Sequence, residues 1–233
     1  MTLTRPDALN AITREMLLGL SAALDELAAD DAIRVVVLTG EGRAFSAGVD
    51  LKALAGRTLE GGGVGDVLDL PARDAIRRLT TIPKVVIARV NGFCFTGALE
   101  LALACDLMVV ADEAKLADTH AKFGLRPTWG MSQRLVRTVG VARARELSYT
   151  ARTFSGSDAA AWGLAVRSVP RAELDDAVAE LAEAIVANSA GSLAAYKDLY
   201  RQALDRGLGD GLDYEAGTDY PITDTEERVA SFR

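Results

Sequence analysis

The sequence predicts an α/β fold followed by a C-terminal region made only of helices. Short runs of β-branched and other apolar residues alternate with amphipathic segments up to residue 169, a pattern typical of strands connected by helices. With 233 residues, of which 49% are hydrophobic, the chain can bury one substantial core. We therefore expect a core domain over residues 1–188 and a helical region over residues 189–233.

In the first half of the chain, the period of the apolar residues separates helices from strands. Apolar residues recur at steps of three and four from Leu9 to Leu27, beside the candidate caps Asp7 and Asn10, and this spacing predicts a helix. The run 33–38 is almost continuously apolar and β-branched, which predicts a strand buried on both faces. The other elements predicted here are a loop with five glycines at 56–65, a helix at 66–80 and a strand at 85–88.

The second half of the chain is mainly helical. A short helix at 99–103 leads to a strand at 107–110, and a strand at 165–169 ends at Pro170. The remaining segments with a helical period are 133–139, 142–149, 157–162 and 173–187. From residue 192 onward the apolar stripes have few strands beside them, so we expect oligomerisation to cover them.

Composition and charge exclude several classes of protein. The net charge of −7 disfavours nucleic acid and anionic membranes as the main partner, because both are bound through basic patches. The two cysteines, Cys94 and Cys105, have no CxxC spacing and imply no disulfide framework. The sequence has no membrane-spanning run and no signal peptide, and with His120 as its single histidine no metal centre is expected. These features predict a cytoplasmic protein.

Two segments about fifty residues apart each combine the end of an apolar strand with a turn that contains glycine. The first reads Ala-Phe-Ser-Ala-Gly-Val-Asp-Leu at 44–51, and the second reads Asn-Gly-Phe-Cys-Phe-Thr-Gly-Ala-Leu-Glu at 91–100. Such turns leave main-chain N–H groups without partners, so two facing turns could hold one thioester oxygen between two donors. The carboxyl of Glu100 would lie one helical turn beyond the second donor. This is the outline of an enzyme that stabilises the enolate of an acyl-CoA.

At these turns the chain resembles the crotonase superfamily, the enoyl-CoA hydratase/isomerase proteins. The resemblance covers nearly the whole chain, and it implies a superhelix of stacked ββα turns with a C-terminal helical region that forms trimers. Each segment alone is a weak signal, but their common order makes accidental similarity improbable. The segments that carry the resemblance are 5–11, 46–51, 91–106, 133–135 and 159–165.

The resemblance implies a site for the thioester carbonyl. The main-chain N–H groups of Ala47 and Gly97 would form an oxyanion hole, and such preorganised donors are typically worth about 3 kcal/mol each in the transition state. The backbone of Ala47, Gly48, Val49 and Asp50, together with Gly97, would contact the substrate. The alternative for the two glycines is a role only in the turns, where glycine is needed for a positive φ.

The resemblance also implies a pair of proton-transfer groups. Glu100 matches one of the two acid/base glutamates of the superfamily's hydratases, and its apolar neighbours in sequence make an idle carboxylate costly. The second glutamate falls at His120, where the chain reads Asp-Thr-His-Ala at 118–121. Imidazole can relay protons near neutral pH. The alternatives are a surface glutamate and a structural histidine, and Asp118 either orients the imidazole or caps the turn.

We therefore expect an enoyl-CoA hydratase that adds water across a trans-2-enoyl-CoA. Glu100 would activate the water that attacks C3, and His120 would deliver the proton at C2. Because the second glutamate is replaced, double-bond isomerisation, decarboxylation and thioester hydrolysis stay open, as does a non-catalytic acyl-CoA-binding protein. The expected partners are the acyl-CoA substrate and further copies of the chain in a homotrimer or hexamer. No cofactor is expected beyond coenzyme A as part of the substrate.

Overall fold

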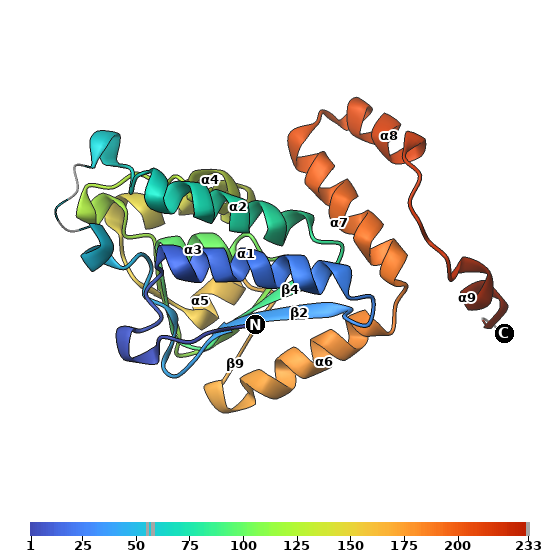
Figure 1. Cartoon of the computed structure of the whole chain (residues 1–233), viewed down its shortest axis with the longest axis horizontal. Coiled ribbons are helices and arrows are strands. Elements are labelled where there is room, and N and C mark those ends of the chain that lie inside the picture. Colours follow the sequence, from blue (N-terminus) through green and yellow to red (C-terminus); the bar gives the residue numbers. More distant parts are fainter. Residues whose placement is uncertain (55, 57–58, 232–233) are drawn as a thin grey trace.

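Two β-sheets form the centre of the fold. The computed structural model describes residues 1–231 except for 55, 57 and 58. A five-stranded sheet has the order β1-β2-β4-β6-β9, and a four-stranded sheet has the order β3-β5-β7-β8. Every pair of neighbouring strands is parallel except β7 and β8. Helices α1 and α2 lie on one side of the five-stranded sheet and α6 on the other (Figure 1).

The chain visits the two sheets alternately. Three times it passes from a strand of the five-stranded sheet directly to one of the four-stranded sheet, as β2–β3, β4–β5 and β6–β7, and helices α2 and α3 follow the first two of these pairs. This is the predicted succession of ββα turns. The strands are β1 (Thr2–Leu3), β2 (Val35–Gly40), β3 (Ala44–Ser46), β4 (Val85–Val90), β5 (Phe93–Phe95), β6 (Leu107–Ala111), β7 (Lys115–Ala117), β8 (Phe154–Ser155) and β9 (Arg167–Val169).

Helices surround the sheets and then continue beyond them. The helices of the core are α1 (Arg14–Ala29), α2 (Asp66–Thr81), α3 (Gly97–Ala102), α4 (Met131–Thr150), α5 (Gly156–Ala161) and α6 (Leu174–Val186). Three more follow, α7 (Ala190–Asp205), α8 (Leu208–Gly217) and α9 (Thr225–Ser231). None of the helices in the described part of the chain combines the length and apolar character that crossing a bilayer needs.

The first helix begins later than the sequence predicted. Thr13 caps α1, and its hydroxyl accepts a hydrogen bond from the Met16 N–H. Asn10, predicted as a cap, is fully buried instead, and its side-chain amide donates to the main-chain oxygens of Glu41 and Ala44. Cap residues and turn residues share the same short polar side chains, so residue type alone could not distinguish the two roles.

Three other predictions can be compared with the structure. In β2 the burial alternates, with Val36 and Leu38 buried and Val35 and Val37 half-buried, so the prediction of a strand buried on both faces is wrong for one face. The segments 133–139 and 142–149 are two helices, as predicted, which lie within the bounds of α4 and are separated at Gly140 by a positive φ of 75°. Of the predicted loop at 56–65, the structure describes residues 56 and 59–65, which include a 3-10 turn at Glu60–Gly62, and residues 57 and 58 lie outside the described residues.

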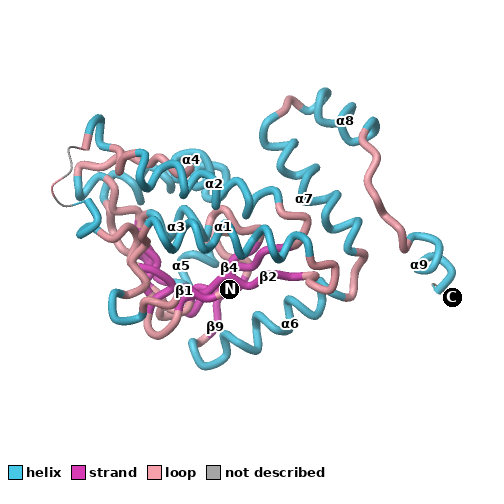
Figure 2. The backbone as a smooth tube through the Cα atoms, in the orientation of Figure 1, coloured by secondary structure: helices cyan, strands magenta, loops and turns pink. Residues whose placement is uncertain are grey.

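The C-terminal helices extend away from the core (Figure 1, Figure 2). Lys197 of α7 connects this region to the core, because its Nζ donates to Leu79 O, Lys84 O and, at 2.7 Å, Asp106 Oδ2. Several large apolar and aromatic side chains of this region are exposed. The prediction that this region forms trimers stays a prediction. The exposed residues are Tyr196, Tyr200, Leu204, Leu208, Leu212, Ile222 and Val229.

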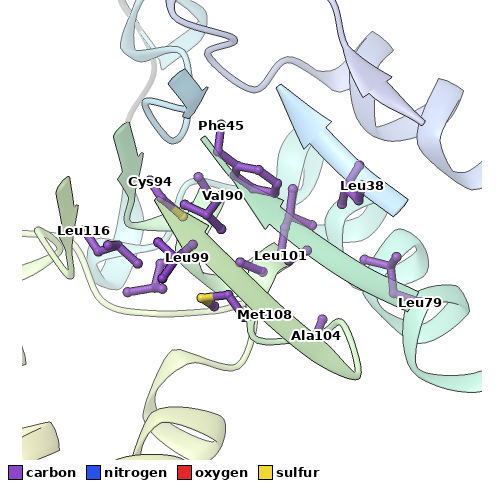
Figure 3. Packing of buried hydrophobic residues seen from close by; sticks show 14 of the residues in the cluster. Leu38, Phe45, Leu79, Val90, Cys94, Leu99, Leu101, Ala104, Met108 and Leu116 are labelled. Carbon is purple, nitrogen blue, oxygen red and sulfur yellow. The ribbon is translucent and has the colours of Figure 1, made fainter. Parts of the chain in front are cut away.

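Helix α3 is short but tightly held by the core. Leu99 and Leu101 are almost completely buried, among the strand residues Val90, Cys94 and Leu116 (Figure 3). Fully burying a leucine side chain contributes roughly 1.5–3 kcal/mol. The six residues of α3 are all buried, so packing rather than helix propensity fixes the position of everything that α3 carries.

Candidate active site

The two glycine-containing turns converge at the ends of adjacent strands. Strands β3 and β5 run parallel, with Ser46 beside Cys94, and the two turns begin at the carboxyl ends of these strands. A Cβ atom added to Gly48 would lie 2.7 Å from Phe95 O and 3.7 Å from the Cβ of Thr96. Because such a separation from a main-chain oxygen is too short for any side chain, only glycine permits this approach. The predicted convergence of segments 44–51 and 91–100 is confirmed.

The first predicted oxyanion donor is engaged elsewhere. The Ala47 N–H donates to Leu9 O at 2.9 Å, so the prediction that this N–H is free to bind a thioester oxygen is wrong. The residues from Leu9 to Ile12 run alongside the first turn and form a parallel bridge between Ile12 and Val49. The sequence pattern located the correct turn, but the choice between neighbouring N–H groups depends on that adjacent segment.

Val49 provides the N–H that points away from this segment. The carbonyl of Gly48 accepts from the Ile12 N–H at 2.8 Å, and in a trans peptide the C=O and the following N–H point in opposite directions. The Val49 N–H is therefore directed away from Ile12, and no acceptor within the described residues bonds it. In the same turn, the Gly48 N–H donates to the hydroxyl of Ser46 at 3.1 Å and the Asp50 N–H to Ile12 O at 2.9 Å.

Gly97 is required for packing and not for a positive φ. The residue with the unusual conformation is Thr96, at φ 52° and ψ −110°, and its hydroxyl bonds that of Thr119. A Cβ on Gly97 would lie 2.6 Å from Cζ3 of the Trp129 ring. The Gly97 N–H opens α3 and has no acceptor within the described part of the chain. Thus Gly97 offers a free donor under an aromatic ring.

Glu100 is a buried and oriented carboxylate. Its Oε1 accepts from the main-chain N–H groups of Trp129 at 3.1 Å and Met131 at 2.9 Å, while the residue is only 2% exposed. Burial raises the pKa of Glu100 above its usual value, against the opposing effects of the Met131 N–H, His120 and the Trp129 N–H. The carboxylate is paired, as predicted, and the alternative of a surface glutamate is excluded. Its use in proton transfer stays a prediction.

His120 faces Glu100 from a different element. The Nε2 of His120 lies 3.6 Å from the Oε2 of Glu100. Its Nδ1 lies 2.7 Å from the Oδ1 of Asp118, which also accepts from the His120 main-chain N–H at 3.2 Å. Asp118 therefore does both things that the sequence left open, since it orients the imidazole and caps the turn. Its other oxygen, Oδ2, accepts from the Ser148 hydroxyl at 2.7 Å.

The side chain of Asp50 is committed inside the protein. Its Oδ2 lies 3.1 Å from Nη1 of Arg5, and its Oδ1 accepts from the Lys52 N–H. Arg5 also donates to Ala11 O at 2.6 Å. The substrate contact predicted at Asp50 is therefore one made by its backbone. This contact stays a prediction, as do the contacts predicted at Ala47, Gly48, Val49 and Gly97.

Residues that the sequence did not indicate complete the surroundings of Glu100. Trp129 donates its main-chain N–H to Glu100 and its Nε1 to Oδ1 of Asp69 on α2 at 2.8 Å. Thr128 donates to the same oxygen at 2.6 Å, and Arg134 donates to Trp129 O at 3.1 Å. Main-chain donors carry no signature in residue type. In the sequence, a tryptophan followed by a glycine, Trp129 and Gly130, is the signal that could have drawn attention to this segment.

Comparison with known proteins gives the same assignment as the geometry. The sequence profile described as enoyl-CoA hydratase/isomerase matches residues 1–232. The chain belongs to the enoyl-CoA hydratase/isomerase family. This family acts on acyl-CoA substrates and is part of the crotonase superfamily. The chain that carries the converging turns and the buried Glu100 is therefore an enzyme of that superfamily.

Members of the enoyl-CoA hydratase/isomerase family with different named activities are similar to this chain. A probable peroxisomal enoyl-CoA hydratase 1 of Arabidopsis thaliana is 38% identical, over 92% of this chain and 79% of the relative. The crystal structure of an enoyl-CoA hydratase from Bacillus anthracis has a TM-score of 0.87 at 34% identity, covering 93% of this chain and 83% of that one. A monofunctional enoyl-CoA isomerase from M. smegmatis has a TM-score of 0.75 at 32% identity, with 90% of both chains covered.

Proposed function

We propose that this protein is an enoyl-CoA hydratase that adds water to a trans-2-enoyl-CoA. The observation that carries the proposal is the pair formed by Glu100 Oε2 and His120 Nε2, which face each other at 3.6 Å. Hydration needs one group that takes a proton from water and one that gives a proton to carbon. Two titratable side chains from separate elements, both almost fully buried, satisfy that requirement.

The spacing of the pair suits a single water molecule. Two atoms 3.6 Å apart can both lie about 2.8 Å from one oxygen, which is a normal hydrogen-bond length. Glu100 takes a proton from this water as its oxygen forms a bond to C3. The electron pair of the C2–C3 double bond moves onto the thioester as an enolate, and His120 Nε2–H then protonates C2. Glu100 finally returns its proton to His120, which restores both groups.

We assign the oxyanion contacts to the N–H groups of Val49 and Gly97. Both belong to the converging turns and lack acceptors among the described residues, whereas the Ala47 N–H is bonded to Leu9. Donors aimed at the position where negative charge develops lower the barrier most when they need no reorganisation. The chain conformation at Gly48 and the ring of Trp129 support this assignment, because they fix both donors before substrate binds.

An NMR titration tests which N–H groups bind the thioester oxygen. Adding a non-reactive CoA thioester analogue to uniformly ¹⁵N-labelled protein is expected to move the amide proton signals of Val49 and Gly97 downfield, as new hydrogen bonds form. The Ala47 amide, already bonded to Leu9, is expected to exchange slowly with D₂O before and after addition. A downfield shift at Ala47 with none at Val49 would restore the original assignment.

The reaction itself is tested with crotonyl-CoA. Purified protein is expected to consume the conjugated thioester and to form 3-hydroxybutyryl-CoA, and His120→Gln is expected to lower kcat by about 10²-fold or more, because the proton donor is lost. No turnover by the wild type, beside an active control enzyme, would reject the hydratase. If His120→Glu hydrates crotonyl-CoA well above the wild type, the natural reaction is a different one.

The replacement of the second glutamate by His120 also supports a second candidate, double-bond isomerisation. This reaction takes a proton from C2 of a 3-enoyl-CoA, which forms the thioester dienolate, and returns a proton at C4, and a similar chain carries the name enoyl-CoA isomerase. Conversion of a 3-enoyl-CoA to the conjugated isomer without net hydration would identify it. Decarboxylation, thioester hydrolysis and non-catalytic acyl-CoA binding would be recognised by the same product analysis.

We propose a homotrimer or hexamer as the working assembly and the cytoplasm as its location. The exposed apolar and aromatic side chains of α7, α8 and α9 support the assembly, since such surfaces are usually covered by another subunit. Their clearest members are Leu208, 82% exposed, and Tyr200, 67% exposed.

A further inference from the structure

Asp118 is a buried carboxylate that accepts three hydrogen bonds next to the proposed reaction site. It follows strand β7 and is 3% exposed. Its Oδ1 accepts from both the main-chain N–H and the Nδ1 of His120, and its Oδ2 accepts from Ser148, thirty residues away on α4. A cap alone would need only the first of these bonds. The other two make a chain from Ser148 through Asp118 to the imidazole and on to Glu100.

We propose that Asp118, held by Ser148, is a positioning residue that fixes a proton on Nδ1 of His120 and stabilises the protonated imidazole that donates to C2. This inference rests on the proposed hydration reaction and adds a residue to it. Which imidazole nitrogen carries the proton in the neutral ring is set by the hydrogen bond made by the other nitrogen. Because Nδ1 donates to a carboxylate, Nε2 is the nitrogen that gains and loses the reactive proton beside Glu100.

The negative charge of Asp118 is the source of the second proposed effect, the stabilisation of the protonated imidazole. Burial alone would raise the pKa of Asp118, but the hydrogen bonds from His120 and Ser148 outweigh it and hold that pKa below the usual value. The carboxylate is therefore ionised at neutral pH and favours the imidazolium form of His120. An oriented but uncharged acceptor would keep the tautomer and lose this stabilisation, so the two effects can be separated experimentally.

Several other titratable groups lie around the imidazole of His120. Glu100 faces the ring from α3 at 3.6 Å, and both α4 and the segment that leads to it contribute to a cavity of about 480 Å³ that His120 lines. Asp118, which also lines this cavity, and Glu100 of α3 are the carboxylates placed against the two imidazole nitrogens. The cationic and phenolic residues that line it are Arg126, Arg145 and Tyr149.

Because the chain has one histidine, its ¹⁵N signals can be followed without assignment, provided that purification uses a tag free of histidine. The neutral ring of the wild type is expected to carry its proton on Nδ1. In Asp118→Ala, which removes the acceptor of Nδ1–H, the proton of the neutral ring is expected to move in part to Nε2. As a charge-matched control, Asp112→Asn removes a carboxylate that is likewise bonded by two serines, Ser157 and Ser168, and should leave His120 unchanged.

Activity provides the second measurement. Asp118→Asn keeps the shape of the side chain and an acceptor for Nδ1–H but loses the charge that stabilises the imidazolium, so it should lower kcat by about tenfold and leave KM close to the wild-type value. A neutral wild-type ring protonated on Nε2, or an unchanged tautomer of His120 in Asp118→Ala, would overturn the inference. Because the NMR measurement needs no substrate, it supports or rejects the role of Asp118 even if crotonyl-CoA is not hydrated.

Discussion

Replacing Glu100 by glutamine is expected to lower kcat by about 10²–10⁴-fold, the usual loss when a positioned acid or base is removed. The Gln carbonyl can still accept from the N–H groups of Trp129 and Met131, which bond Oε1 in the wild type. Folding and binding of CoA esters should therefore survive, while the group that takes the proton from water is gone. Steady-state hydration of crotonyl-CoA and binding of a CoA ester by calorimetry separate the two effects.

The matched control for this variant is Glu26→Gln. Glu26 lies on the exposed surface of α1, so the variant changes the net charge by the same amount and should keep the wild-type kcat. A Glu100→Gln protein that turns over crotonyl-CoA at the wild-type rate would remove Glu100 from its proposed role.

Glu100→Gln is also expected to change how the stability of the protein depends on pH. Since burial raises the pKa of folded Glu100, the folded protein holds this proton more tightly than the unfolded chain. The resulting stabilisation is complete below the unfolded pKa of about 4.3 and is lost as pH rises through the folded pKa. Glutamine is neutral at every pH, so the Tm of Glu100→Gln relative to the wild type should increase from pH 4.5 to pH 7.5. A relative Tm that falls over this range would contradict the assignment of burial as the dominant effect on the pKa of Glu100.

Gly97→Ala is expected to damage both stability and catalysis. The new Cβ would lie 2.6 Å from Cζ3 and 3.1 Å from Cε3 of Trp129, and the indole cannot move freely because its Nε1 bonds Asp69. Overpacking of this kind costs about 1–3 kcal/mol, and displacement of one oxyanion donor lowers kcat by about 10²–10³-fold. Thermal unfolding and crotonyl-CoA turnover measure the two losses.

Gly19→Ala is the control, because it makes the same substitution of glycine by alanine at a position without a steric conflict. Gly19 is exposed within α1 and has no atom within 4 Å of its added Cβ, so alanine should stabilise the helix by up to about 1 kcal/mol. The double variant Gly97→Ala/Trp129→Leu removes the ring that the new methyl group meets and should recover part of the lost Tm. Wild-type stability and turnover in Gly97→Ala alone would show that neither the ring nor the donor is constrained as described.

Much of the fold was predictable because its strands are marked by local patterns. The β-branched run of β2 and the apolar run of β4 each end at a glycine or asparagine turn, and α2 was predicted to within one residue of its observed end at Thr81. The start of α1 was misplaced because Asn10 bonds main-chain oxygens more than thirty residues away. Such long-range contacts leave no trace in the period of the apolar residues.

The site was predictable where side-chain chemistry identified it and not where main-chain geometry did. Glu100 and His120 are titratable residues in apolar or unusual contexts, and the structure brings them to 3.6 Å. The sequence pointed to the N–H of Ala47, which is bonded to Leu9 O, because every non-proline residue carries the same N–H group. Only the segment from Leu9 to Ile12, which accepts the N–H of Ala47 and donates to the carbonyl of Gly48, distinguishes Val49 from its neighbour.

The amino-acid sequence by itself determined the class of fold, the family and the two turns that meet, because these depend on residue type and spacing along the chain. Only the tertiary structure decided which N–H groups are free, that Asp118 joins His120 to Ser148, and that Trp129 covers Gly97. Hydrogen bonds and ring contacts of this kind join residues far apart in sequence, and their geometry exists only after the chain has packed.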